Sequence, residues 1–352
     1  MTWGFAMPSE PMRSPSSTQP LRIAVIGAGA IGGHFAARLA EAGHSVTVLD
    51  RGATLDAIQK HGLRYASGSD PQRSIAVRAA ASPLEMESPG LVVLALKSHV
   101  LPTVVPTLSP LLQGGATVLP IGNGLPWWYF LVPGKPLSGL RLRRVDPEGA
   151  IERTIDMQQV LGGSVMASCH CPEPGSVVHS SGGRVSIGEP AGGNSARAQH
   201  WAGVLADAGL GAVVSDDIRS ELWLKLLGNA CANPLSLLTG VTTDRMLDDG
   251  PMRQLFERMM NECITLGRSL GLTIQTDATQ RMAQTRKLGA IKTSMLQDLE
   301  AGRSVELDAI LGAALESASA LQQQVPQLES AFALACMRAQ QAGLYVPGVA
   351  GP

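Results

Sequence analysis

The chain has 352 residues, enough for two domains that each bury their own core. Hydrophobic residues make up 45% and charged residues 16%, as in an ordinary soluble globular protein, and the net charge of −1 without a basic block argues against a nucleic-acid partner. No apolar run reaches the roughly 20 residues that span a bilayer, so we expect no spanning helix and no membrane partner.

The two ends and the cysteines add little chemistry. Residues 1–20 are rich in Pro and Ser and lack an apolar segment, which predicts a disordered leader rather than a secretory signal. The five cysteines are few and odd in number, which favours free thiols in a reducing compartment, and we expect a cytoplasmic protein. His170 lies between Cys169 and Cys171, but no second pair of zinc-type ligands is visible, so no metal is expected.

Residues 21–49 predict a strand, a tight turn, a helix and a second strand. The apolar run Ile23–Ile26 ends at the turn, the helix runs from about Ile31 to Ala42, and Ser45–Leu49 is the second strand. In this context the G-x-G-x-x-G turn indicates a dinucleotide-binding Rossmann fold: the first glycine makes the turn, the second admits a pyrophosphate, and the third lets the helix pack closely. The helix N-terminus adds a partial positive charge for the phosphates. The turn reads Gly27, Ala28, Gly29, Ala30, Ile31, Gly32.

Asp50 and Arg51, directly after the second strand, bear on the choice of cofactor. An acidic residue at this strand end usually accepts hydrogen bonds from the ribose hydroxyls of NAD, whereas an arginine pairs with the 2′-phosphate of NADP. This chain has both, and either can also be a solvated surface residue. These two residues therefore leave NAD and NADP open.

Two further strands end at polar residues. Leu91–Leu96 is a continuous apolar run, typical of a strand buried in a parallel sheet, and Lys97 follows it. Ala116–Ile121 is the next strand, and Asn123 follows it between two glycines. Because open α/β sheets bind ligands at the carboxyl ends of their strands, both side chains are candidates for ligand contact. The alternatives are a capping lysine and a simple Asn-Gly turn.

The segment after Asn123 is unusual for this protein. Trp127 to Phe130 are four consecutive aromatics in a chain with only 4% aromatic residues. They either line a site or anchor a long loop, and we favour the rim of a site.

The rest of the chain predicts a change of structural class. Strands are expected at 160–167, 176–179 and 184–187, with turns at Pro174-Gly175 and Gly182-Gly183, then a helix at 196–208 and a strand at 212–214. Beyond a helix N-cap at residues 215–217, only helical periods follow. We therefore expect an α/β plus all-α protein, with an N-terminal Rossmann-type doubly wound sheet (21–215), an all-helical C-terminal domain (216–345) and a tail (346–352).

The helix predicted within Ser220–Gly240 carries polar side chains on an otherwise apolar surface. Lys225, Asn229 and Asn233 recur every four residues and so share one face. A lysine buried there needs partners or has a lowered pKa, which makes it a candidate for proton transfer. The alternative is a lysine that extends to solvent beside two asparagines.

Ser294 and Glu306 lie on either side of a helix break at Gly302. A serine and a carboxylate so placed can point into one cleft. Glu306 can equally stabilise the first turn of its own helix, which is a common use of a glutamate.

Together these residues resemble the ketopantoate reductase (2-dehydropantoate 2-reductase) family over about residues 21–340. The most specific part is Lys225-xxx-Asn229-xxx-Asn233-Pro234-Leu235 combined with Ser294 and Glu306 at the family's separation. The resemblance implies NADPH-dependent reduction of 2-dehydropantoate to pantoate, a step of pantothenate and coenzyme A biosynthesis, in a cleft between the two domains.

The resemblance also implies roles on the substrate side. Lys225 is the proton donor, which stabilises the charge that develops on the carbonyl oxygen. Asn229 and Asn233 hold the 2-oxo acid, and Ser294 contacts its carboxylate.

On the cofactor side, the resemblance implies that residues 27–32 bind the dinucleotide and that Arg51 receives the 2′-phosphate of NADPH. Lys97 contacts the cofactor, and Asn123 lies between nicotinamide and substrate. Glu306 helps to fix both substrate and cofactor. NAD stays open as an alternative because of Asp50.

Two departures from the family pattern bear on the substrate. Some members place an asparagine well after the Asn-Pro pair, where this chain reads Gly-Val-Thr-Thr-Asp-Arg at 240–245, and the segment from the aromatic run to about Arg153 is longer than the pattern requires. Bulky apolar groups near the cleft would suit a larger or less polar 2-oxo acid. A related reductase of such an acid and a non-catalytic NADPH-binding regulator are the alternative functions. Helical domains of this kind often pair, so a homodimer is a possible assembly.

Overall fold

The computed structural model describes residues 19–346. The expected leader and tail therefore fall almost wholly outside the described residues. Within residues 19–346, no helix is long and apolar enough to cross a membrane.

A five-stranded parallel sheet forms the centre of the N-terminal part. Its order is β5-β2-β1-β6-β7, so the chain leaves β1 toward β2 on one side and later returns to place β6 on the other. This change of direction is the topological switch point, where open α/β sheets bind their ligands. The strands are β1 (Arg22–Ile26), β2 (Ser45–Leu49), β5 (Arg78–Ala80), β6 (Leu91–Leu94) and β7 (Thr117–Pro120).

Helices cover both faces of this sheet, which explains the continuous apolar runs of its strands. One face packs against α1 (Ala30–Glu41) and α6 (Ala196–Asp207). The other face packs against a series of short helices: α3 (Leu101–Val104), the 3₁₀ turn at Val105–Leu108, α4 (Ser109–Leu112) and α5 (Ala150–Thr154). The remaining elements of this part are α2 (Gly52–His61) and the 3₁₀ turns at Pro83–Glu85, Ser98–Val100 and Met157–Gln159.

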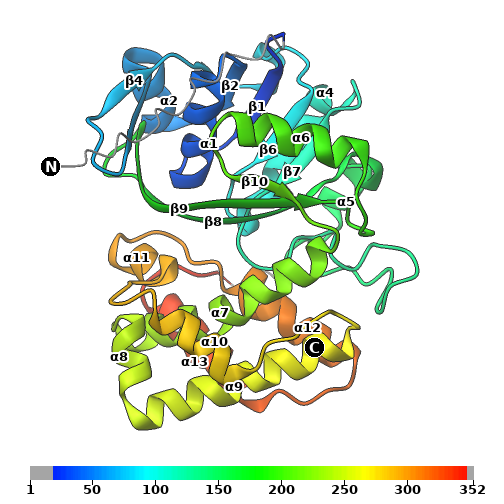
Figure 1. Ribbon diagram of the computed structural model, residues 1–352, viewed down its shortest axis with the longest axis vertical. Coiled ribbons are helices and arrows are strands. Elements are labelled where there is room, and N and C mark those ends of the chain that lie inside the picture. The colour runs from blue at the N-terminus through cyan, green and yellow to red at the C-terminus, as the bar shows by residue number, and fades with distance from the viewer. Residues whose placement is uncertain (1–18, 347–352) are drawn as a thin grey trace, which may run out of the picture.

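A second sheet lies beside the parallel sheet, and its strands β8 and β9 run between the parallel sheet and the helical part (Figure 1). It contains β3 (Leu63–Ser67), β4 (Arg73–Ile75), β8 (Gly162–His170), β9 (Ser176–Gly188) and β10 (Ala212–Val214). The prediction of a turn at Gly182-Gly183 is wrong, because β9 continues through these glycines. Their positive φ angles of 77° and 155° accompany register shifts against β8, so the glycines form a bulge within the strand.

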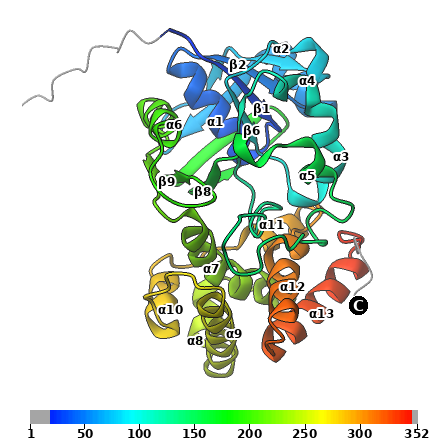
Figure 2. The ribbon, with the colours of Figure 1, turned by 90° about the vertical axis from the view of Figure 1, so that its right-hand side faces the viewer.

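The C-terminal part is all-helical, which confirms the predicted fold class. Its first helix, α7, begins beside β8 and β9 and runs into the group of helices below them (Figures 1 and 2). Asp217 caps α7 by accepting a hydrogen bond from the Ser220 amide at 3.1 Å, and Gly240 ends it with a φ of 72°. The helices are α7 (Ile218–Thr239), α8 (Thr243–Asp248), α9 (Gly250–Ser269), α10 (Ala278–Arg286), α11 (Ser294–Glu300), a π-helical turn (Asp308–Gly312), α12 (Ala313–Ala320) and α13 (Pro326–Gln341).

The aromatic run lies in the core at the junction of the two parts. Trp127, Trp128, Tyr129 and Phe130 are each at most 1% exposed. Tyr129 also joins its loop to α7, since its hydroxyl donates to the Arg219 carbonyl at 2.8 Å and the Arg219 Nε donates to the Tyr129 carbonyl at 3.1 Å. The prediction of a site rim is therefore wrong for the last three aromatics, which hold the parts together. Trp127 alone of the four lines a cavity, described below.

Candidate active site

The glycine turn between β1 and α1 is shaped to admit a pyrophosphate. A Cβ atom on Gly32 would lie 1.9 Å from the Gly27 carbonyl oxygen, and Gly27 itself has a φ of 94°, so both positions require glycine. A Cβ atom on Gly29 would meet nothing within 4 Å, which leaves its backbone open to an approaching group. The first turn of α1 has no side-chain cap and no acidic residue, so its N–H groups are free to bind an anion.

Asp50 ties the end of β2 to this turn. Its Oδ2 accepts a hydrogen bond from the Ala28 amide at 2.6 Å, and its Oδ1 accepts one from the Arg51 amide at 2.8 Å. The Arg51 side chain is exposed, and it forms no ion pair within the described part of the chain. Asp50 thus has a structural task, while the Arg51 guanidinium is available to a ligand.

The carboxyl end of β6 is bound directly by the helical part. The Lys97 ammonium lies 2.7 Å from an Asp298 carboxylate oxygen and donates to the Ser304 carbonyl at 2.6 Å. The neighbouring Ser98 amide donates to Glu306 Oε1 at 3.0 Å. Sequence reasoning missed Asp298 and the Ser98 amide, although Asp298 lies four residues after Ser294 and so on the same face of α11.

Glu306 lies between the carboxyl end of β6 and helix α7. Burial raises the pKa of its carboxyl, and this shift is opposed by the Ser98 amide, the Lys97 ammonium and a hydrogen bond from Asn123. Glu306 in turn interacts electrostatically with Lys225. The structure therefore brings together four of the predicted site residues. Two follow the ends of β6 and β7, one lies on α7, and one precedes the π-helical turn: Lys97, Asn123, Lys225 and Glu306.

Lys225 is half-buried in the middle of α7. Burial lowers the pKa of its ammonium to about 8, and the Glu306 carboxylate partly opposes this shift. Among residues 19–346, no hydrogen bond or ion pair occupies the Lys225 ammonium, in contrast to Lys97. A lysine with these properties can donate a proton near neutral pH.

Asn233 and Ser294 lie on α7 and α11, two helices that are in contact. Asn233 is 3% exposed, and its Nδ2 is buried without a hydrogen-bond partner among the described residues, which suits a ligand acceptor. One turn further along α7, the Ser236 hydroxyl bonds to the hydroxyl of Thr293, the cap of α11. This contact places Ser294, which is exposed, beside the last turns of α7. Asn229 is half-buried, one turn from both Lys225 and Asn233.

An apolar cavity adjoins these polar groups. The cavity is small, and Ser98 and Asn123 form its polar edge. Because both residues bind Glu306, that edge belongs to the candidate site. The main apolar lining residues are Leu96, Leu101, Leu125, Trp127, Val145 and Leu222.

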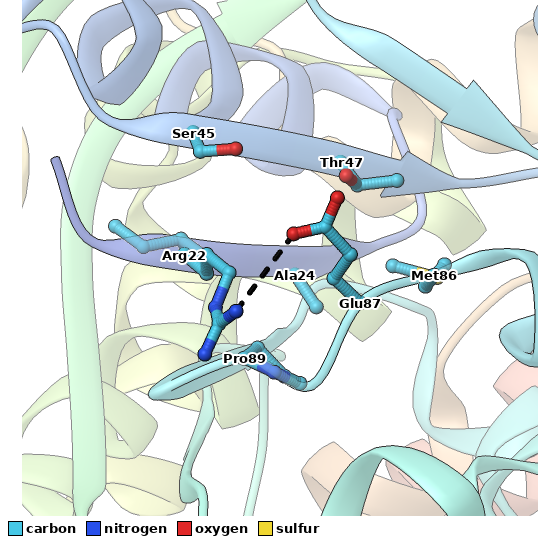
Figure 3. Close-up of a pocket in the computed structure, with 8 residues that line it drawn as sticks. Arg22, Ala24, Ser45, Thr47, Met86, Glu87 and Pro89 are labelled. Carbon is cyan, nitrogen blue, oxygen red and sulfur yellow. Dashed lines mark ion pairs between the residues drawn. The ribbon is translucent and has the colours of Figure 1, made fainter.

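A second hollow lies at the opposite edge of the parallel sheet (Figure 3). It is lined by Arg22, Ser45 and Pro89, at or near the amino ends of β1, β2 and β6. Its two charged side chains, Arg22 and Glu87, lie 3.8 Å apart, and Glu87 also pairs with Arg78 at 3.0 Å. These charges neutralise one another, and the hollow forms no part of the candidate site.

Comparison with known proteins identifies the family that shares this arrangement. The profile described as "Ketopantoate reductase PanE/ApbA" matches residues 23–192, and the profile described as "Ketopantoate reductase PanE/ApbA C terminal" matches residues 217–339. The chain belongs to the ketopantoate reductase family. It is thus an oxidoreductase, and its glycine turn and its α7 lysine lie in two separately recognised regions.

Named relatives agree with this family assignment. A 2-dehydropantoate 2-reductase of Mesorhizobium japonicum is 42% identical over 327 residues, which cover 92% of this chain and 100% of the relative. A crystal structure from Ralstonia solanacearum MolK2, which carries the provisional name ketopantoate reductase, is 39% identical, has a TM-score of 0.89 and covers 93% of this chain and 100% of its own. A D-mandelate dehydrogenase, solved with NADH and anilino(oxo)acetate, shares the fold with a TM-score of 0.79 at 21% identity, covering 92% of this chain and all of its own.

Proposed function

We propose that this protein catalyses the NADPH-dependent reduction of 2-dehydropantoate to pantoate, with Lys225 as the proton donor. The observation that carries the proposal is the lysine with a pKa of about 8 beside Glu306, whose carboxylate accepts a hydrogen bond from the Ser98 amide just after β6. The name of the Mesorhizobium japonicum relative supports the choice of substrate.

The chain's own residues supply the proton and the groups that bind the substrate. A bound reduced nicotinamide would deliver the hydride to the C2 carbonyl carbon. The Lys225 ammonium stabilises the negative charge that develops on the carbonyl oxygen and transfers its proton there. Asn229 and Asn233 orient the substrate without competing for that proton, because an amide does not titrate in this range. Ser294 binds the substrate carboxylate. The product is the 2-hydroxy acid.

The proposed cofactor site combines the glycine turn with the residues after β2. The open backbone at Gly29 and the uncapped N-terminus of α1 support a pyrophosphate there. Arg51 would receive the 2′-phosphate of NADPH. Because both Asp50 oxygens already accept backbone hydrogen bonds, we favour NADPH over NADH.

The direct test follows the loss of NADPH absorbance with purified protein and a panel of 2-oxo acids, repeated with NADH. We expect 2-dehydropantoate to give the highest kcat/KM and NADPH to be preferred. Binding of NADPH without turnover of any 2-oxo acid would contradict the proposal and favour a regulator.

A bulkier 2-oxo acid is a second candidate substrate, and the apolar cavity beside Asn123 favours it. The fold shared with D-mandelate dehydrogenase shows that this architecture also serves a protein solved with an aromatic ligand, anilino(oxo)acetate. The cavity wall includes Trp127, whereas Trp128 is buried and does not line the cavity.

The two tryptophans give a matched test of the second candidate. We expect Trp127→Phe to raise kcat/KM for bulky 2-oxo acids relative to 2-dehydropantoate, because it enlarges the cavity, and Trp128→Phe to leave this ratio unchanged. The measurement is kcat/KM over the same panel. An unchanged ratio in both variants would remove the cavity from the substrate site.

A further inference from the structure

The long loop between β7 and α5 reaches into the helical part through Arg144. The Arg144 guanidinium donates to Asp308 Oδ1 at 3.1 Å and lies 4.8 Å from the centre of the Phe332 ring. The Arg144 backbone amide donates to Glu316 Oε1 at 3.1 Å. With side-chain exposures of 17% for Arg144 and 12% for Asp308, this is a largely buried ion pair, and such pairs are costly to break from one side.

Arg144 thus binds the π-helical turn Asp308–Gly312. A single residue, Leu307, separates this turn from Glu306. The Tyr345 hydroxyl donates to the same Asp308 oxygen at 2.9 Å, so the start of this turn is fixed by two donors. A Cβ atom on Gly312 would lie 2.4 Å from the Arg144 Cδ, so the turn also leaves room for the arginine. π-Helical turns are rare and are often found at functional sites.

The beginning of the same loop binds the other side of this segment. The Asn123 amide lies near the Glu306 carboxyl and lowers its pKa, and the Leu125 amide donates to the Ala309 carbonyl at 2.8 Å. A Cβ atom on Gly124 would lie 2.2 Å from that carbonyl oxygen, so the two backbones are in close contact. The two ends of this one loop therefore both bind the segment that contains Glu306.

We propose that Arg144 is a positioning residue that holds Glu306 in place toward Asn123, Ser98 and Lys225. Arg144 is not among the residues proposed to bind substrate or cofactor, and it acts by fixing the turn that follows Glu306. A lysine could not replace it fully, because only the planar guanidinium both pairs with a carboxylate and stacks on a ring. The inference rests on the proposed function in that Glu306 and Lys225 act together at the site.

The test uses the apparent pKa of Lys225 as a measure of whether the Glu306 carboxylate is in place. The charged groups that face Glu306 are Lys97, Asp298 and Lys225. A displaced Glu306 carboxylate no longer supports the Lys225 ammonium, so Arg144→Gln should lower the apparent pKa of Lys225 by roughly half a unit or more. Simple loss of a nearby positive charge has the opposite sign, because it would raise that pKa.

The measurement is the pH dependence of amine acetylation at Lys225, followed by mass spectrometry on the folded full-length chain. Glu306→Gln should lower the Lys225 pKa in the same direction, and adding Arg144→Gln to it should cause no further decrease. Arg141→Gln is the matched control, since Arg141 lies in the same loop and pairs with Glu152 on the surface. A Lys225 pKa in Arg144→Gln that equals or exceeds that of the unsubstituted protein would overturn the proposal.

Tyr345→Phe keeps the test decisive if Arg144→Gln does not fold. It removes one donor to Asp308 without changing any charge at neutral pH. This variant should lower the Lys225 pKa by a smaller amount than Arg144→Gln. If Arg144→Gln is unfolded, an unchanged Lys225 pKa in Tyr345→Phe would also overturn the proposal. The acetylation readout needs no substrate. Failure of the unsubstituted protein to reduce any 2-oxo acid would therefore disprove the proposed function and leave the outcome for Arg144 interpretable.

Discussion

Lys225 combines a low exposure with a free ammonium, and this combination sets its chemistry. Burial disfavours the charged form, so the pKa falls from 10.5 to about 8, and the Glu306 carboxylate limits the fall. Lys97 lies at the end of β6 and is occupied by Asp298 and the Ser304 carbonyl. Two lysines near the same candidate site therefore differ in their availability to a ligand because their partners differ.

Lys225→Ala should reduce kcat for 2-dehydropantoate by roughly two to four orders of magnitude, because it removes a proton donor whose interaction is made mainly in the transition state. NADPH affinity, measured by fluorescence titration, should change little. Lys292→Ala, which removes a surface lysine paired with Glu300, is the control. Equal losses in kcat and NADPH affinity would contradict the assigned role.

The pH profile of the reduction follows from the same pKa. The ammonium is the acid, so kcat/KM should be level below about pH 8 and should fall as pH rises through that value. Glu306→Gln removes the carboxylate that raises the Lys225 pKa and should move the fall to lower pH. A profile that stays level well above pH 8 would assign the proton donor elsewhere.

Arg51→Ala should weaken NADPH binding by roughly one to two orders of magnitude and NADH binding much less, since a charged hydrogen bond to the 2′-phosphate is lost. Dissociation constants for both cofactors provide the measurement. Arg22→Ala, at the opposite edge of the sheet, is the control. An unchanged preference would favour Asp50 and NAD.

At the scale of elements, the unit β1-α1-β2 follows from its sequence because all its contacts are local. Gly27, Gly29 and Gly32 differ in what surrounds them: Gly27 faces the Leu96 side chain, Gly32 faces the Gly27 carbonyl, and Gly29 faces open space. The same short motif thus contains both enclosed and open glycines.

Gly29→Ala and Gly32→Ala should separate these two roles. Gly32→Ala places a methyl group against the Gly27 carbonyl and should destabilise the fold by about 1–3 kcal/mol. Gly29→Ala meets no protein atom, so the melting temperature should hardly change while NADPH binding weakens. Thermal unfolding and cofactor titration of both variants are the measurements, and full NADPH affinity in Gly29→Ala would contradict close approach of the pyrophosphate.

Elements that depend on distant partners were harder to predict. The two glycines in β9 suggested a turn, but pairing with β8 accommodates them as a bulge. The aromatic run suggested a site rim, but the surface that covers it comes from α7 and other elements far along the chain. Local patterns contain no information about such packing.

At the scale of the whole molecule, the candidate site was predictable as a set of residues but not as an arrangement. The spacing of Lys225, Asn229 and Asn233 fixes their common helix face, and this required only the helical period. Contacts such as Ser98 to Glu306 and Lys97 to Asp298 join residues about 200 positions apart, and no periodicity reports them. The resemblance to a family grouped Lys97, Asn123, Lys225 and Glu306 into one expected site, but it did not supply their contacts with Asp298 and the Ser98 amide.

The continuous core beneath the aromatic run has a consequence for how the two parts depend on each other. Val92 and Val118 of the parallel sheet belong to the same buried cluster as Trp128, Trp223 of α7 and Leu328 of α13. Separating the dinucleotide-binding half from the helices would expose this apolar surface to water at about 25 cal/mol per Å². We therefore expect the two regions recognised by sequence to depend on each other for stability, because the half that would bind the cofactor shares this core with the half that carries the lysine.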